Sequence, residues 1–257
     1  MIGFLCVDKR KGDTSAYVVN RIKKLTKCPC GHMGTLDPLA SGVLPVGIGQ
    51  ATRMFQFLLD KKKSYVADFD FSFSTPSLDL ETEVVARSDK KITIDEVNAA
   101  IPRLCGTVMQ VPPVFSAKCV DGKRSYKLAR RGETVDLPPK EVTIENIEVL
   151  KQNSDYSFTF KIDCLGGTYI RSIAGVLGNL LDACGTMTSL RRTASGVFDE
   201  KESLTLDRLF ESGCNIEDYI IPAEETVFYP RLTLDENEER RLLNGLYDDF
   251  AFENGLY

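Results

Sequence analysis

Several residue types and motifs on which enzyme classes depend are scarce or absent in this sequence of 257 residues. It contains a single histidine, His32, so a Ser-His-Asp or Cys-His site would have to use that residue, and no GxSxG motif surrounds any serine. Neither GxGxxG nor GxxxxGK followed by Ser or Thr occurs, which excludes the usual nucleotide-phosphate cradles. The segment Cys28-Pro-Cys30 is one residue short of a CxxC motif and has no second pair, so we expect no zinc site.

Long hydrophobic runs are also missing. No stretch is long and apolar enough to span a bilayer, and the opening residues lack the charged-then-apolar order of a signal peptide. We therefore expect a cytoplasmic protein with no membrane partner. The hydrophobic content of 43% and the charged content of 27% are ordinary globular values. The eight cysteines are scattered, which in a reducing compartment predicts free thiols.

The formal net charge of −5 is unevenly distributed. Residues 231–257 carry a net charge of −4, whereas residues 117–131, AKCVDGKRSYKLARR, carry +5. Shorter basic groups lie within 21–27, 61–63 and 191–192. Each cluster alone is typical of a solvated surface. Several clusters interleaved with aromatic side chains favour a nucleic-acid partner, because phosphates respond to local charge.

Hydrophobic periodicity predicts strands and helices that mix without a regular βαβ order. Residues 64–74, SYVADFDFSFS, alternate between apolar and polar positions and predict a half-buried strand of an antiparallel sheet. Further strands are predicted within 2–7, 142–152 and 156–164, and helices within 14–26, 93–105 and 168–184. The sequence therefore predicts an α+β fold with a large, mixed but mainly antiparallel sheet flanked by helices.

Residues 31–53, GHMGTLDPLASGVLPVGIGQATR, place one carboxylate, Asp37, among glycines, prolines and small residues. We expect neither a regular helix nor a central strand from this composition. Pro38 moves Asp37 toward an extended conformation, and a nearby arginine would keep the carboxylate ionised. A carboxylate held in this way is suited to act as a nucleophile, although Asp-Pro is also common in ordinary turns.

The same segment closely resembles the motif of TruB-type tRNA pseudouridine synthases, roughly GH-T/S-GTLDP-x-A-x-GVLP-x-x-x-G-x-AT. Five further blocks resemble that family in order and spacing. They are VDKRKGDTSAYVVNRIK, KSYVADFDFSFSTPSLDLETEVV, VPPVFSAKCVDGKRSYKLARRGETVDLPPKEVTI, CLGGTYIRSIAGVLG and SLRRTASGVF. Together the blocks cover residues 3 to about 198.

The resemblance implies a pseudouridine synthase fold and gives several residues a role. Asp37 would be the nucleophile that attacks the target uridine, at C1′ of the sugar or at C6 of the base. Tyr65 would stack on the flipped base and assist proton transfer, and Arg171 would pair with Asp37. Tyr169 and Leu190 would line the pocket around the target nucleotide. Simpler roles stay open. Tyr65, Tyr169 and Leu190 could be ordinary core residues, and Arg171 could lie on the surface of a helix.

Four more residues fall in the family blocks and would bind substrate or RNA: His32, Lys9, Asp79 and Lys118. His32 would lie at the RNA surface, and its alternative role is a neutral imidazole hydrogen-bonded in a turn. The implied substrate is the T loop of tRNA, in which the family modifies the uridine at position 55. The target base would leave its stack to reach the carboxylate. The implied isomerisation needs no cofactor and no metal.

The chain departs from the family pattern at several places. Arg10 and Met33 stand where proline and Thr or Ser are usual, and LDLETE lacks the glycine expected near Thr82. Family members commonly carry an RNA-binding PUA domain, and residues 231–257 resemble only its beginning. We therefore expect a catalytic domain over 1–230 and a short or truncated PUA-like segment over 231–257.

Two other functions stay open: a guide-RNA-dependent pseudouridine synthase subunit, and a tRNA-folding chaperone in which catalysis is secondary. The form LDPLASG and the lack of basic extensions favour a stand-alone enzyme of the bacterial type. We expect a monomer with no obligatory protein partner.

Overall fold

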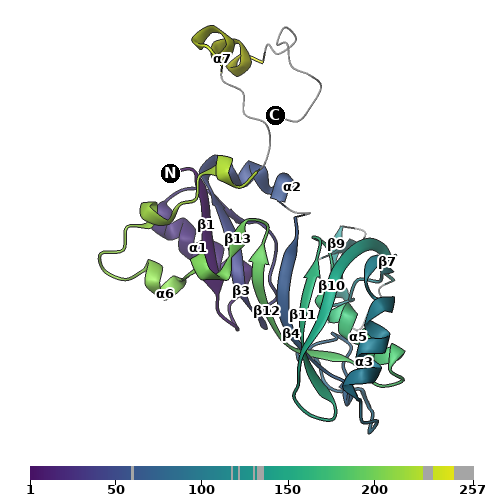
Figure 1. Ribbon diagram of the computed structural model, residues 1–257. Helices are drawn as coiled ribbons and strands as arrows, with labels where there is room; N and C mark the ends of the chain where they lie inside the picture. The colour runs from purple at the N-terminus through teal and green to yellow at the C-terminus, as the bar shows by residue number, and fades with distance from the viewer. Residues whose placement is uncertain are drawn as a thin grey trace.

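The computed structural model of the chain describes residues 1–58, 61–116, 118–120, 122–129, 131, 136–227 and 234–245. Within these residues a ten-stranded mixed sheet has the order β14-β1-β3-β12-β4-β11-β10-β7, with β2 paired to β3 and β13 to β12 (Figure 1). Its strands are β1 (Gly3–Lys9), β2 (Cys30–His32), β3 (Ala40–Ile48), β4 (Lys63–Asp70), β7 (Gly106–Gln110), β10 (Lys140–Gln152), β11 (Ser157–Cys164), β12 (Thr186–Ser195), β13 (Phe198–Asp199) and β14 (Leu204–Thr205). All neighbouring strands are antiparallel except the pairs β1–β14 and β3–β12. The predicted α+β fold with a mainly antiparallel sheet is confirmed.

Strand β4 lies in the middle of the sheet and follows the predicted alternation. Every second residue from Tyr65 to Phe69 is buried, and the strand pairs with β11 and β12. It ends at Asp70, earlier than predicted, because the Asp70 carboxylate accepts hydrogen bonds from the N–H and the hydroxyl of Ser72 and turns the chain. Phe73 therefore lies in a separate short strand, β5 (Phe73–Ser74), which pairs with β6 (Ala86–Arg87).

Helices α1 (Ser15–Thr26), α3 (Ile94–Ala100) and α5 (Ile170–Leu180) pack on the sheet (Figure 1), and a short helix, α6 (Leu206–Leu209), also contacts β1 and β14. Helix α1 contacts β2 and β3, whereas α3 and α5 contact strands of the β12-β4-β11-β10 half. Helix α1 begins where predicted, because the Thr14 hydroxyl accepts a hydrogen bond from the Tyr17 N–H at 3.0 Å. Helix α5 buries the predicted apolar face, which is Ile170, Ile173, Ala174, Leu177 and Leu181. The shorter helices are α2 (Phe55–Leu58), α4 (Ser125–Ala129) and α6 (Leu206–Leu209).

Helix α3 is shorter than the sequence predicted. A capping box of Thr93 and Glu96 starts it, and it ends at Ala100. A 3-10 turn over Ile101–Arg103 follows, because Pro102 has no N–H to continue an α-helical ladder. The prediction that Gly106 lies just past the end of this helix is wrong. Gly106 instead begins β7, with a φ of 93°.

The expectation that the glycine- and proline-rich segment contains no central strand is wrong, because Ala40–Ile48 forms β3. This strand pairs with β1 along its length, and on its other edge with β12 and then with β2. The Pro45 carbonyl accepts a hydrogen bond from the Met33 N–H on that second edge. In a strand, the N–H and C=O of one residue point to the same edge. Pro45 points its C=O away from β1, so the N–H that proline lacks would not have bonded to β1 either. At Gly42 a Cβ would lie 2.2 Å from the Arg192 carbonyl oxygen, so glycine is required.

The main core lies between the sheet and helices α1, α3 and α5. Phenylalanines of neighbouring strands pack against one another within it, with the Phe69 and Phe160 ring centroids 4.8 Å apart. A second, smaller cluster contains Phe4, Met33 and Phe198. Met33, one of the departures from the family pattern, is therefore packed inward.

Two of the basic groups expected at a solvated surface are partly internal. Arg192 is 1% exposed and Lys63 is 5% exposed. Arg191 is tied to Asp8 at 3.1 Å and to Glu200 at 2.8 Å. Residues of the basic segment 117–131 lie partly outside the described residues. Clustered charge in the sequence therefore does not translate directly into a basic surface.

The C-terminal segment is described only over residues 234–245, which contain α7 (Glu236–Leu243). Asp235 and Glu238 cap this helix, and none of its residues is buried. The rest of 231–257 lies outside the described residues, so the PUA-like segment stays a prediction. In the part of the chain that the structure describes, no helix is long and apolar enough to cross a membrane.

Candidate active site

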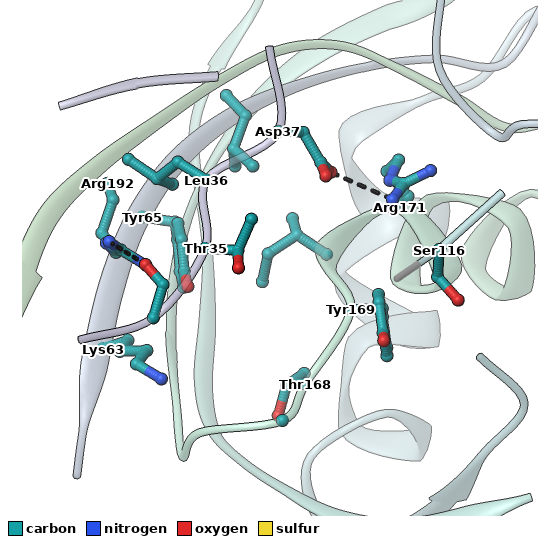
Figure 2. A pocket seen from close by; sticks show the side chains of 14 residues that line it. Thr35, Leu36, Asp37, Lys63, Tyr65, Ser116, Thr168, Tyr169, Arg171 and Arg192 are labelled. Carbon is teal, nitrogen blue, oxygen red and sulfur yellow. Dashed lines mark hydrogen bonds and ion pairs between the residues drawn. The ribbon is translucent and has the colours of Figure 1, made fainter. Parts of the chain in front are cut away.

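A cavity of about 260 Å³ lies where the loop between β2 and β3 meets β4, β12 and the N-terminal end of α5 (Figure 2). Five of the residues predicted from the sequence line it together, namely Asp37, Tyr65, Tyr169, Arg171 and Leu190. They are separated by up to 153 positions in the chain, so the fold brings them together. The cavity is slightly smaller than the roughly 300–1,000 Å³ typical of small-molecule sites.

The loop that carries Asp37 is fixed on both sides of this residue. The Ser15 hydroxyl donates to the Leu36 carbonyl and accepts from the Leu36 N–H, both at 2.9 Å. The Pro38 carbonyl accepts from the Gly12 N–H at 2.7 Å. The backbone is therefore held while the Asp37 side chain remains 37% exposed and open to the cavity.

Arg171, in the first turn of α5, is the buried cation opposite Asp37 (Figure 2). Its Nη2 lies 3.0 Å from Asp37 Oδ2, and its Nη1 lies 3.5 Å from Asp79 Oδ2. Nη1 also donates to the carbonyls of Ser77 at 3.2 Å and Phe115 at 3.0 Å. Oxygens of four residues thus fix the guanidinium, which presents one of its nitrogens to Asp37.

Opposing effects act on the ionisation of Asp37. Burial raises the pKa of the Asp37 carboxyl above its ordinary value, and the negative charges of Asp79 and Glu81 raise it further. The Arg171 guanidinium acts in the other direction, through its charge and its hydrogen bond. The net direction is upward, and Arg171 limits this rise.

Tyr65 and Leu190 form the sheet wall of the cavity. They lie on the paired strands β4 and β12, where Leu190 is opposite Ala67, and both are buried. Burial raises the pKa of the Tyr65 phenol above its ordinary value of 10.0, with Arg192 acting in the opposite direction. The phenol is therefore protonated at neutral pH, and its ring offers a flat surface to the cavity.

Tyr169 precedes the first residue of α5 and is held by a residue that the sequence did not single out. The Gln110 side chain accepts from the Tyr169 N–H at 2.8 Å and donates to the Tyr169 carbonyl at 3.1 Å. Gln110 is the last residue of β7 and is buried. This amide satisfies backbone groups at the helix start and fixes where α5, and thus Arg171, begins.

Lys63 and Arg192 also line the cavity and were not predicted as site residues. Figure 2 shows both next to Tyr65. Arg192 donates from Nε to the Val43 carbonyl at 2.7 Å and from Nη2 to the Gly34 carbonyl at 3.1 Å. For Lys63 the two-residue strand period was an available signal, because Lys63 is two positions from Tyr65 in the predicted strand. Arg192 lies two positions from Leu190 in β12, a strand that the sequence did not predict.

His32 lies outside the cavity. It is the last residue of β2 and lines a separate shallow hollow with residues of α1 and with Phe55. Burial lowers the pKa of the imidazole, and the Arg192 charge lowers it further. Its Nδ1 is buried with no hydrogen-bond partner among the described residues. The ring is therefore neutral at physiological pH, and the structure does not place it against Asp37.

Lys9 and Asp79, expected to bind substrate or RNA, are both internal. The Lys9 ammonium donates to the carbonyls of Arg10 at 3.0 Å and Asp13 at 2.7 Å, and burial lowers the pKa of Lys9 to about 8. Asp79, 2% exposed, lies against Arg171. Both side chains hold neighbouring parts of the protein here, and their role in binding substrate or RNA stays a prediction.

Lys118 is half-buried and lies two residues beyond Ser116, which lines the cavity. Its carbonyl accepts a hydrogen bond from the Ser125 N–H at 2.7 Å, at the start of α4. The RNA-binding role expected of Lys118 stays a prediction.

Comparison with known proteins gives this arrangement a family. Residues 21–170 match the family described as TruB family pseudouridylate synthase, N-terminal domain. Among curated proteins, the tRNA pseudouridine synthase B of Clostridium tetani is 40% identical over 249 residues, which cover 96% of this chain and 85% of that protein. The chain belongs to the TruB family. The enzyme of the same name from Anaplasma marginale is 44% identical over 208 residues, covering 80% of this chain and 68% of that protein.

Solved structures extend the TruB-family likeness to the fold. A chain in the crystal structure of a Cbf5-Nop10-Gar1 complex is 30% identical and has a TM-score of 0.68, with 88% of this chain and 61% of that chain covered. A chain in the structure of an H/ACA RNP bound to a substrate RNA containing 2′-deoxyuridine is 29% identical with a TM-score of 0.65, covering 88% and 60%. The chain thus spans about 60% of the length of those structural relatives.

Two remaining features of this TruB-family chain lie away from the cavity. Arg10, which replaces the usual proline, is exposed and pairs with Asp207 at 2.9 Å. Cys28 and Cys30 are free thiols. Over the residues that the structure describes, no group of three or more His, Cys, Asp or Glu side chains is arranged to hold a metal ion.

Proposed function

We propose that this chain isomerises uridine to pseudouridine in the T loop of tRNA, at position 55. The observation that carries the proposal is the ion pair of Asp37 and Arg171, at 3.0 Å, on the wall of a cavity that also contains Tyr65 and Leu190. The curated relatives that bear the name tRNA pseudouridine synthase B, and cover most of this chain, support the substrate.

In this proposal the target nucleotide leaves its stack and enters the cavity, because its reacting atoms are inaccessible inside the folded RNA. Tyr65 and Leu190 receive the base on the sheet wall, and Asp37 faces it from the loop. RNA loops are recognised through such splayed bases and through shape, which suits a recessed site of this size.

The Asp37 carboxylate then attacks the nucleoside at C1′ or C6 and forms a covalent bond. The bond between N1 and C1′ breaks, the uracil turns in place, and C5 bonds to C1′. C5 loses its proton, N1 gains one, and the bond to Asp37 is released. The proton from C5 exchanges with solvent, which also supplies the one gained at N1, so the reaction is an isomerisation with no net gain of atoms or electrons. The protonated Tyr65 phenol lies where it can exchange a proton with the base.

The experiment is tritium release from tRNA labelled at uridine C5. Purified chain at low concentration should release tritium equivalent to one uridine per tRNA, and Asp37→Asn should release none while it still binds tRNA. Substitution of the T-loop uridine at position 55 should abolish release by the unchanged chain. Tight binding of tRNA without any release would instead favour a folding chaperone.

A second candidate is suggested by the likeness to chains of H/ACA complexes, which would make this chain a guide-dependent subunit. The same assay on an isolated T stem-loop, with purified chain and no other RNA or protein, separates the two. Release under these conditions supports a stand-alone enzyme with no obligatory partner, whereas release only after guide RNA is added would support the second candidate. Size-exclusion chromatography with light scattering tests the expected monomer.

A further inference from the structure

The loop over residues 75–82 has an unusual conformation and packs tightly against α5. Leu78 has a φ of 60°, in the left-handed region that non-glycine residues seldom adopt. Its carbonyl accepts from the Met187 N–H at 3.0 Å, and its N–H donates to the Thr75 carbonyl at 3.1 Å. Its side chain lies over Gly175, where a Cβ would come within 3.1 Å of Leu78 Cδ2. The loop is therefore pinned to both β12 and α5.

This loop supplies two of the oxygens that hold Arg171. The Ser77 carbonyl accepts from Nη1 at 3.2 Å, and Asp79 Oδ2 lies 3.5 Å from the same nitrogen. Arg171 in turn contacts Asp37 through Nη2. Because the guanidinium is planar and rigid, a shift of the oxygens at Nη1 moves the nitrogen at Asp37.

A set of hydroxyl groups closes the loop on itself. The Thr82 hydroxyl oxygen accepts from the Ser77 N–H at 3.1 Å and lies 2.8 Å from the Ser77 hydroxyl. The Thr75 hydroxyl donates to the Asp79 carbonyl at 2.6 Å, and the Ser77 hydroxyl donates to it at 3.2 Å. Ser77 is fully buried. These hydrogen bonds join Thr82 at one end of the loop to Ser77 near the other.

We propose that Thr82 is a positioning residue for the isomerisation, whose hydroxyl locks Ser77 and thereby keeps the Ser77 carbonyl and Asp79 on Arg171. The inference rests on the proposed function, since it concerns the orientation of Arg171 toward the nucleophile. Without the Thr82 hydroxyl, the buried N–H of Ser77 loses its acceptor, and the loop must shift to find another. The guanidinium then follows the loop and its ion pair with Asp37 lengthens.

The consequence should be visible in the pH dependence of the reaction. Asp37 is faced by Arg171 on α5, by Asp79 and Glu81 on the loop, by Lys9 on β1 and by Tyr65 on β4, with Arg192 beside Tyr65. Arg171 lowers the pKa of Asp37 against burial and the two acidic residues. A longer ion pair lets the pKa of Asp37 rise, so the rate should begin to fall at a higher pH during acidification.

The test compares Thr82→Val, which removes the hydroxyl at constant shape, with Thr82→Ser, which keeps it. Single-turnover rates on tRNA are measured from pH 5 to 9, together with KM and Tm. We expect T82V to lose roughly tenfold in rate at neutral pH with little change in KM, and its acidic limb to move to higher pH. T82S should match the unchanged chain in both. T82G is the second hydroxyl-free variant and decides the question if T82V does not fold.

The outcomes separate the two proposals. If the unchanged chain releases no tritium from tRNA, the proposed function fails. If it is active and a folded hydroxyl-free variant keeps its rate within twofold, the role of Thr82 is overturned. A lower rate with an unmoved acidic limb, or one that T82S shares, would also overturn it, because a purely structural defect has that signature.

Discussion

The two walls of the cavity are built in different ways. The sheet wall, with Tyr65 and Leu190, consists of neighbouring strand positions that a two-residue period places on one face. The charged wall, with Asp37, Arg171 and Asp79, joins two loops and a helix start, and no local pattern relates its members. The sheet wall gives shape to the site, whereas the charged wall shifts the pKa of one carboxylate. Substitutions should therefore act on the two walls through different measurable quantities.

The largest effect is expected at the nucleophile. Asp37→Asn should lower the rate of tritium release by roughly 10⁴-fold or more, because an amide cannot form the covalent bond. The Asp37 side chain is 37% exposed and asparagine has nearly the same shape, so Tm should stay within a few degrees of that of the unchanged chain. tRNA binding by filter retention provides the control. Appreciable turnover by folded D37N would show that Asp37 is not the nucleophile, and would contradict the role given to the charged wall.

Arg171→Lys should follow, with a loss of about 10³-fold, because an ammonium cannot contact Asp37 and Asp79 through separate nitrogens as the fork does. Weaker pairing raises the pKa of Asp37 further. Since the protonated carboxyl is not a nucleophile, the acidic limb of the pH–rate profile should move to higher pH. If the rate of R171K is low but the acidic limb of its pH–rate profile is unmoved, Arg171 acts on the substrate and not on Asp37.

On the sheet wall, Tyr65→Phe keeps the ring and removes the phenol. A loss of about 10²-fold is expected if the phenol transfers a proton, with KM and Tm nearly unchanged. The acidic limb should stay in place, in contrast to R171K. Leu190→Val is the matched control for the shape of this wall, and it should alter KM more than the maximal rate. If Y65F reacts as fast as the unchanged chain, the phenol transfers no proton, and Tyr65 acts only by stacking on the base.

The smallest effect is expected for Glu81→Gln. Glu81 is exposed, and its charge raises the pKa of Asp37. Its removal should lower that pKa and move the acidic limb to lower pH by less than about one unit, since exposed charges are screened. The shift should shrink at high salt. A shift to higher pH would contradict the electrostatic description of the charged wall.

Part of the sheet wall was predictable from the sequence, and little of the charged wall was. Alternation over 64–70 placed Tyr65 on a buried face, and the same period would also have placed Lys63 there. Leu190 was named only through the family resemblance, because no strand was predicted over 186–195. Arg171 and Asp37 were related only through the family resemblance, because contacts between distant loops leave no periodic signal. The partners of Arg171 at Ser77 and Phe115 are backbone carbonyls, which any residue supplies, so no side-chain pattern could reveal them.

Local sequence by itself determined the elements whose side chains alternate or cap: β4, β10 and β11, the start of α1 at Thr14, and the buried face of α5. Their signals depend on neighbours within a few residues. Only the tertiary structure decided that the glycine- and proline-rich segment contains the central strand β3, since its tolerance of Pro45 depends on which partner lies at each edge. It also decided that Lys9 and Asp79 are internal, because burial of a charge depends on partners brought from elsewhere in the chain.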